Sequence, residues 1–401
     1  MSGFDKDRLA RIRGWMQGYV DARKYAGCSA LISQSGKEAF YHESGLRDVE
    51  AGLPWQRDTV ARIYSMTKPI TSVAMMILVE RGLTHLDAPV SDFIEGFKDT
   101  RCLVPDASDI TQTEPCAAPT LHELLTHTSG LSYSFNPGIV PQAMHAGKLD
   151  FGPGRRALEQ GSDALAELPL AFHPGARWEY SVGIDIIGRV IEVISDKTLE
   201  AFFNDEIFGP LGMSETGFTV PPASQDRFAA LYTPLAGDSF DLNAAEKSAQ
   251  TLHSADGSQS SPYYSSAMHS GGGGLVGTID DYLKFTEMLR TGGKGILSPS
   301  TLQFMMCNHL AGDIASMGPS SFAEQPMHGM GFGIGGAVAL DPSRAGVPGS
   351  MGDFSWGGMA STFFWIDPVH DVSVIFFTQL SPSSSYPSRA HLKALVHGAL
   401  T

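Results

Sequence analysis

Ser65 and Lys68 place a hydroxyl and an amine one helical turn apart, in the sequence Ser-Met-Thr-Lys. Residues i and i+3 of a helix lie on the same face, so the amine of Lys68 can reach the hydroxyl of Ser65. Serine needs a neighbouring base to act as a nucleophile, and the positive end of a helix favours negative charge there. Because about one Ser-x-x-Lys is expected by chance in a chain of this composition, the motif indicates a nucleophile only together with its surroundings.

Tyr180 is a second candidate for proton transfer. It stands just before a run of apolar residues with helical spacing, so we expect it at the N-terminus of a helix. A tyrosine in that position is usually a packing residue. Its phenol can relay a proton if a cation such as Lys68 lowers its pKa.

Trp356, Gly357 and Gly358 form the third motif, inside a β-rich run. Adjacent glycines in a strand commonly mark a bulge, but they also allow a substrate to approach the backbone closely. The second interpretation leaves the N–H of Met359 free to bind an oxyanion.

The elements that must position these groups follow a simple order along the chain. Strand patterns lie near both ends, and short helices joined by polar loops lie between them. We expect helices at 5–22, 65–81, 280–289 and 388–400, a hairpin of strands 28–33 and 38–42, and strands at 331–340, 355–366 and 372–380. This order predicts an α/β protein with a sheet domain formed by residues 1–84 and 275–401 and a mainly helical domain, 85–274, inserted into it.

Composition excludes several other classes of protein. The formal net charge of −15 argues against nucleic acid and against anionic membrane surfaces, and no apolar run approaches the ~20 residues of a membrane span. The four cysteines are scattered and no metal-ligand spacing occurs among the histidines, so we expect neither a metal nor another cofactor. The N-terminal residues lack the pattern of a signal peptide, which predicts a cytoplasmic protein.

Together, the three motifs resemble the serine β-lactamase and penicillin-binding fold. The resemblance is greatest to its carboxylesterase branch, the family VIII esterases related to class C β-lactamases. It extends over nearly the whole chain and includes the segments 124–131, 172–175, 210–213 and 272–275. It implies a β-lactamase/transpeptidase-like fold, in which an antiparallel sheet is flanked by helices.

The resemblance also implies roles for single residues. Ser65 would be the acylated nucleophile, and Lys68 with Tyr180 would form the general-base pair. The N–H groups of Ser65 and Met359 would make the oxyanion hole, and Trp356, with Gly357, Gly358 and Val182, would line the pocket for substrate. No Gly-x-Ser-x-Gly motif is present, which removes the α/β-hydrolase route to the same chemistry.

Two departures from the β-lactamase pattern bear on the substrate. Val182 stands where those enzymes have the asparagine of Tyr-x-Asn, and Trp356-Gly357-Gly358 stands where they have Lys-Thr-Gly. The first removes an amide that would hold a substrate's acylamino group at this position. The second removes a cation suited to a substrate carboxylate. Both favour a neutral ester over an anionic lactam.

Three other residues near these motifs are open to more than one interpretation. Tyr133, after the turn at Ser129-Gly130, either faces the cleft or is simply packed, and the residues do not decide between the two. His127 and His173 lie in loops typical of the family and are expected to fix backbone by hydrogen bonds rather than to act as bases.

The sequence therefore predicts a serine esterase that hydrolyses short to medium acyl esters, with a small-molecule ester as its partner. A β-lactamase, a D-amino-acid peptidase or an acyltransferase would use the same residues. A non-catalytic binding module is the remaining alternative, and the presence of Ser65, Lys68 and Tyr180 argues against it. Residues 236–270, rich in serine, aspartate and alanine, form a surface excursion that is a candidate cover over a cleft.

Overall fold

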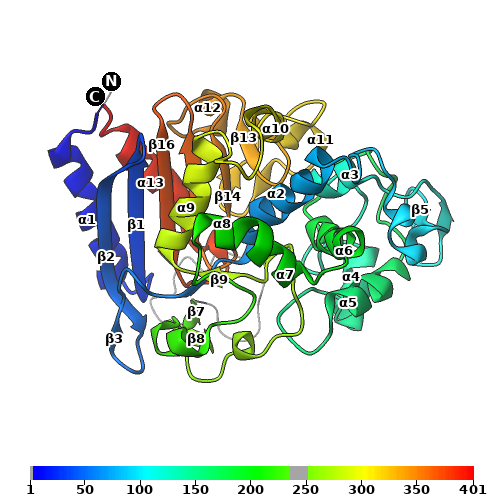
Figure 1. The fold of residues 1–401 in the computed structure, drawn as a ribbon, viewed down its shortest axis with the longest axis horizontal. Helices are drawn as coiled ribbons and strands as arrows, with labels where there is room; N and C mark the ends of the chain where they lie inside the picture. Colours follow the sequence, from blue (N-terminus) through cyan, green and yellow to red (C-terminus); the bar gives the residue numbers. More distant parts are fainter. Residues whose placement is uncertain (1–2, 235–251) are drawn as a thin grey trace.

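A single eight-stranded antiparallel sheet organises the molecule, in the order β12-β13-β14-β15-β16-β1-β2-β3 (Figure 1). The computed structural model describes residues 3–234 and 252–401. The strands are β1 (Gly27–Gln34), β2 (Lys37–Asp48), β3 (Leu53–Pro54), β12 (Met330–Phe332), β13 (Ala337–Ala339), β14 (Phe354–Gly357), β15 (Phe363–Asp367) and β16 (Val372–Thr378). The pairing of β1 with β16, from Cys28 opposite Thr378 to Gln34 opposite Val372, joins the two ends of the chain.

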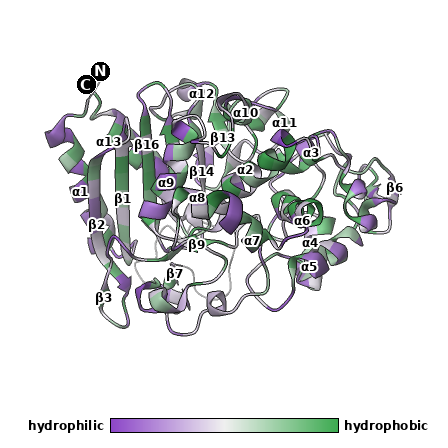
Figure 2. Ribbon diagram, in the orientation of Figure 1, coloured by the Kyte–Doolittle hydropathy of each residue, from purple (hydrophilic) through white to green (hydrophobic). Residues whose placement is uncertain are grey.

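Both faces of the sheet are covered, which explains the continuous apolar runs of its central strands. On one face, Ala30 and Ile32 of β1 pack with the buried residues of α1 (Lys6–Asp21) and α13 (Ser388–His397). On the other face, Leu31 of the same strand packs in the core that includes α2 (Thr67–Glu80) and α9 (Ile279–Arg290). Figure 2 shows these apolar strands between helices whose outer faces are more hydrophilic.

The middle of the chain supplies mostly helices. They are α3 (Leu121–Leu125), α4 (Ile139–Gly147), α5 (Leu158–Ala166), α6 (Gly183–Ser195), α7 (Leu199–Phe203) and α8 (Gly209–Leu211). Helix α2 lies between the sheet and these helices, and packs against α6 (Figure 1). Its residues from Thr67 to Leu78 are all buried, and the uninterrupted apolar run 73–79 predicts such a buried helix. The division into domains 1–84 with 275–401 and 85–274 stays a prediction.

The antiparallel sheet flanked by helices agrees with the sequence, but two predicted strands are wrong in detail. The runs 331–340 and 355–366 are each a hairpin, β12–β13 and β14–β15, rather than one strand. A turn through Gly335, whose φ is +87°, reverses the first run. In the second, Ser361 has a φ of +62° and donates its N–H to the carbonyl of Gly358.

The candidate cover at 236–270 falls partly outside the described residues. Its later part forms β8 (His253–Asp256), which pairs with β7 (Leu231–Thr233), and a 3-10 turn, Pro262–Tyr264. Among the residues that the structure describes, no helix is long and apolar enough to cross a membrane.

His397, in the last turn of α13, gives the fold a predicted sensitivity to acid. Its side chain is only 10% exposed, and burial, followed by the nearby cation of Lys393, lowers its pKa to about 4. An unfolded histidine titrates near 6.5, so between those values the unfolded chain binds the proton more readily. We expect a loss of up to about 3 kcal/mol of folding free energy as pH falls from 6.5 to 4, measured by urea unfolding.

The matched variants are His397→Gln and His85→Gln, because His85 is exposed. The first should lose less stability than the wild type over this pH range, and the second should follow the wild type. Equal acid sensitivity in all three proteins would contradict the assignment.

Candidate active site

Ser65 lies in a single 3-10 turn, Tyr64–Met66, between a short strand and the buried helix α2. The strand is β4 (Ala61–Arg62), which pairs with β9 (Val276–Gly277). Tyr64 has a φ of +43°, a left-handed conformation that is costly for a non-glycine residue. The backbone is therefore forced into an uncommon turn at the residue that precedes Ser65.

The structure brings together the three residues predicted to carry the chemistry. The amine of Lys68 lies 3.2 Å from Ser65 Oγ, and the phenol of Tyr180 donates to the same oxygen at 2.6 Å. Lys68 Nζ also lies 4.5 Å from the centroid of the Tyr180 ring. Two groups able to exchange a proton thus contact one serine hydroxyl.

Lys68 is completely buried, and each of its three N–H donors has an acceptor. Besides Ser65, these are the phenol oxygen of Tyr133 at 2.9 Å and the carbonyl of Gly272 at 2.7 Å. The ring of Tyr133 lines the cavity beside Ser65, and burial raises its pKa well above the usual range. Of the two interpretations of Tyr133, the structure therefore supports the one in which it faces the cleft.

Asp185, a buried carboxylate on α6, was missed by sequence reasoning. It accepts hydrogen bonds from the hydroxyl of Ser270 at 2.5 Å and the N–H of Gly272 at 2.9 Å. Burial raises its pKa, and the charge of Lys68 opposes that shift. A Cβ on Gly272 would lie 2.2 Å from the carboxylate, so glycine is required there. The available signal was an acidic residue inside the apolar run 183–191.

A cavity of about 700 Å³ opens beside Ser65. Tyr180, Trp356 and the backbone from Gly357 to Met359 line it as expected, and its remaining wall is rich in aromatic side chains. Val182 was also expected to line the substrate pocket, but it is fully buried and does not line the cavity. It precedes the first turn of α6, where its N–H donates to the carbonyl of Ser132 at 3.2 Å.

Gly358 is a glycine because other backbone lies against it. A Cβ there would be 2.3 Å from the carbonyl oxygen of Ile63 and 2.5 Å from Oγ1 of Thr362. The end of β14 therefore packs directly on the segment that leads to Ser65. The following N–H, that of Met359, donates to no group in the part of the chain that the structure describes.

The two histidines differ in their surroundings. His127 is fully buried, and its Nδ1 accepts the N–H of Ser181, next to Tyr180. Burial, with the charge of Lys68, lowers its pKa well below 6.5, so it is neutral in the folded protein. His173 lies outside the cavity and its ring pairs with the carboxylate of Glu114 at 2.8 Å. The backbone contact expected of His127 is present, whereas the ring of His173 binds a side chain instead.

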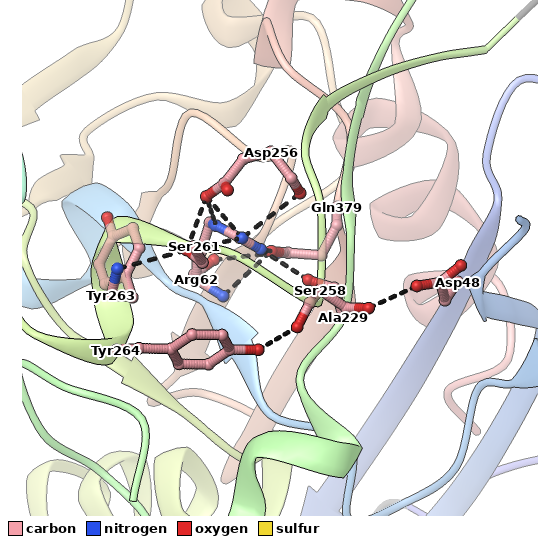
Figure 3. A network of polar contacts seen from close by, with 9 residues as sticks. All are labelled: Asp48, Arg62, Ala229, Asp256, Ser258, Ser261, Tyr263, Tyr264 and Gln379. Carbon is pink, nitrogen blue, oxygen red and sulfur yellow. Dashed lines mark hydrogen bonds and ion pairs between the residues drawn. The ribbon is translucent and has the colours of Figure 1, made fainter. Parts of the chain in front are cut away.

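Arg62 anchors the segment that leads to Ser65 (Figure 3). Its guanidinium is fully buried and binds the carboxylate of Asp256 at 2.6 Å and the carbonyl of Ala229 at 2.6 Å. Gln379 contacts both its backbone N–H and its carbonyl. The guanidinium of Arg62 also lies over the ring of Phe228, with its Cζ 4.1 Å from the ring centroid. Arg62 thereby ties the chain three residues before Ser65 to three distant segments.

Two groups of side chains are close enough to share a metal ion in the described residues, and neither lines the cavity. One comprises Cys102, Glu114 and His173, and the other Asp367, His370 and His397.

The fold and this site define a serine hydrolase with a β-lactamase/transpeptidase-like fold. The family model described as Beta-lactamase matches residues 12–398, and the chain belongs to that family. Esterase EstB of Burkholderia gladioli is 33% identical over 377 residues, covering 92% of this chain and 90% of the relative. Protein Rv1367c of Mycobacterium tuberculosis is 34% identical over 386 residues, with the same coverage.

The solved structure of EstCE1, a hydrolase with promiscuous acyltransferase activity, superposes with a TM-score of 0.81 at 29% identity, covering 98% and 99% of the two chains. These relatives place the chain among the family VIII esterases.

Replacing Arg62 by methionine tests its anchoring role. Arg62→Met leaves a carboxylate, an amide oxygen and a carbonyl without their buried partner, so we expect a loss of about 3–5 kcal/mol of folding free energy by urea unfolding. Arg81→Met is the matched control, because Arg81 is 48% exposed and pairs with Glu206. That exposed pair should contribute less than about 1 kcal/mol. Equal losses in the two variants would show that the Arg62 network does not anchor this segment.

Proposed function

We propose that this protein hydrolyses short to medium acyl esters through an acyl-enzyme on Ser65. One observation carries the proposal: Ser65 Oγ lies within hydrogen-bond distance of both Lys68 and Tyr180, in the wall of the aromatic cavity. The pair removes the proton of Ser65 as its oxygen attacks the ester carbonyl. The two groups act as a unit, because both contact the same oxygen.

The oxyanion that forms in this step needs donors that are already in place. The N–H groups of Ser65 and Met359 supply them. Met359 lines the cavity, and its N–H donates to no group among the residues that the structure describes. The C–O bond to the alcohol then breaks, and the alcohol leaves with the proton held by the Lys68 and Tyr180 pair. Water repeats the attack on the acyl-enzyme, which releases the acid and restores Ser65.

The lining of the cavity supports an ester as substrate. Phe135, Phe151, Phe322 and Trp356 give it an apolar wall suited to an acyl or alcohol group. The esterase name of the relative from Burkholderia gladioli agrees with this choice. Transfer of the acyl group to an alcohol or amine is the second candidate, because EstCE1 is described as having promiscuous acyltransferase activity. The cytoplasmic location stays a prediction.

Hydrolysis of p-nitrophenyl butyrate tests the nucleophile. The wild type should cleave this ester, and Ser65→Ala should reduce kcat at least about a thousandfold, because no other nucleophile replaces the hydroxyl. Circular dichroism of the variant shows whether it is folded. Equal cleavage by the two proteins would mean that Ser65 is not the nucleophile.

Nitrocefin run in parallel separates the β-lactamase alternative. We expect the ester to be turned over much faster than the lactam, because Val182 replaces the asparagine that holds the acylamino group of a lactam in the resembling family. Turnover of nitrocefin alone would make the protein a β-lactamase. Faster release of p-nitrophenol with an added alcohol, together with formation of a new ester, would favour the acyltransferase.

Gly358→Ala tests the oxyanion donors. The new Cβ must move away from the carbonyl of Ile63, which shifts the N–H of Met359 relative to Ser65. We expect kcat for p-nitrophenyl butyrate to fall on the order of a hundredfold, with a smaller change in KM. Gly18→Ala is the control, since no atom of the described residues lies within 4 Å of a Cβ at that position. A folded Gly358→Ala variant with unchanged kcat would argue against Met359 as a donor.

A further inference from the structure

Arg389 brings a cation into the cavity from an element that carries none of the three motifs. It lies in the first turn of α13, and its side chain is 16% exposed. A Cβ on Gly357 would lie 2.3 Å from one of its terminal nitrogens, so the guanidinium lies where the side chain of residue 357 would otherwise be. The missing side chain of Gly357 therefore makes room for Arg389 in the cavity wall.

Within the described parts of the chain, the guanidinium of Arg389 has one ion-pair partner and makes no hydrogen bond. Its Nε forms an ion pair with a carboxylate oxygen of Glu324 at 3.2 Å, but without the alignment of a hydrogen bond. In residues 3–234 and 252–401, its two terminal NH₂ groups make no hydrogen bond either. Buried polar groups normally have partners, and a guanidinium suits a carboxylate, which it binds through two parallel hydrogen bonds.

The other charged groups of the cavity are already satisfied. Asp150 accepts the hydroxyl and the N–H of Ser134, and Asp185 accepts Ser270 and Gly272. Lys68 contacts three oxygens and does not itself line the cavity. Arg389 is therefore the one lysine or arginine in the described lining that is available to a ligand, and its partner Glu324 lies outside that lining.

The position of Arg389 relates it to the reacting atoms. Gly357, against which the guanidinium packs, is two residues before Met359, a chain distance of about 7 Å in extended backbone. In a substrate bound by both groups, only a few carbon atoms would thus separate the carboxylate on Arg389 from the ester carbonyl held by the N–H of Met359.

We propose that Arg389 is a carboxylate-binding subsite and that the preferred substrates are esters that also carry a free carboxylate. The inference rests on the proposed esterase function and narrows its substrate class. It also revises the expectation of a neutral ester, because the cation absent at position 356 is supplied from α13. The alternative is a structural ion pair in which Arg389 and Glu324 only hold the hairpin of β10 (Ser321–Phe322) and β11 (Gln325–Pro326) on α13.

Paired substrates test the proposal, each pair differing only in the carboxylate. Mono-p-nitrophenyl glutarate and its methyl ester place the charge on the acyl side. 4-Butyryloxybenzoate and its methyl ester place it on the alcohol side. The readout is the ratio of kcat/KM for the charged ester to that for the neutral ester, and the pair with the higher ratio identifies the side that Arg389 binds.

Arg389→Gln should lower that ratio about tenfold or more, chiefly through KM, because a charge-assisted pair is lost. Arg389→Lys should lower it less, since it keeps the charge but not the two parallel bonds. Glu324→Gln should raise it by removing the competing carboxylate. Arg344→Gln, at an arginine that is 57% exposed and outside the cavity, should leave it unchanged.

An unchanged ratio in Arg389→Gln, or equal losses on charged and neutral esters in both Arg389→Gln and Glu324→Gln, would overturn the subsite and leave the structural pair. If the wild type cleaves no ester, the proposed function fails by itself. The subsite is then measured directly, by calorimetric titration of glutarate into the wild type, Arg389→Lys and Glu324→Gln. Equal or absent glutarate binding in all three would refute it.

Discussion

The burial of the Lys68 amine is the constraint on which the site depends. An ammonium group removed from water is costly unless every N–H has an acceptor and a counter-charge lies near. Three oxygens from separate parts of the chain meet this need, those of Ser65, Tyr133 and Gly272. The carboxylate of Asp185 is the nearby counter-charge, and it also accepts a hydrogen bond from the N–H of Gly272. Ser65, Gly272 and α6 are therefore held in place around one buried cation.

A second buried cation lies on the other side of Ser65. Arg62 precedes Ser65 by three residues and Lys68 follows it by three, and both are completely buried. Arg62 is held by Asp256, Gln379 and Ala229, so it fixes the entry to the turn, while Lys68 fixes its exit. This double attachment explains how the uncommon φ of Tyr64 persists, because the contacts on both sides determine the turn.

Local patterns were readable from the sequence, and distant pairings were not. The spacing of Ser65 and Lys68 predicted their contact, and apolar periodicity predicted α1, α2 and α9 to within a few residues. The hairpins of β12–β13 and β14–β15 were missed, because glycine-rich turns inside apolar runs look like one strand. Asp185 and Arg389 were also missed: their partners, Gly272 and Gly357, are distant in sequence and offer no local signal. Tyr180 was a candidate for proton transfer from its sequence position, but that position favoured packing, and its pairing with Lys68 as a general base rested on the family resemblance.

The two glycines after Trp356 show how the end of one strand, β14, allows two close contacts. Without side chains, Gly357 leaves room for the guanidinium of Arg389, and Gly358 allows β14 to touch the carbonyl of Ile63. Ile63 is two residues before Ser65, so this backbone contact fixes the distance between the segment carrying Ser65 and that carrying Met359. The two N–H groups proposed to bind the oxyanion come from segments nearly 300 residues apart, and they are positioned relative to each other by this contact. The strands β14 and β15 pair in regular register up to Gly357, so the glycines here allow a close backbone contact rather than a bulge. The proposed oxyanion geometry follows from that packing contact.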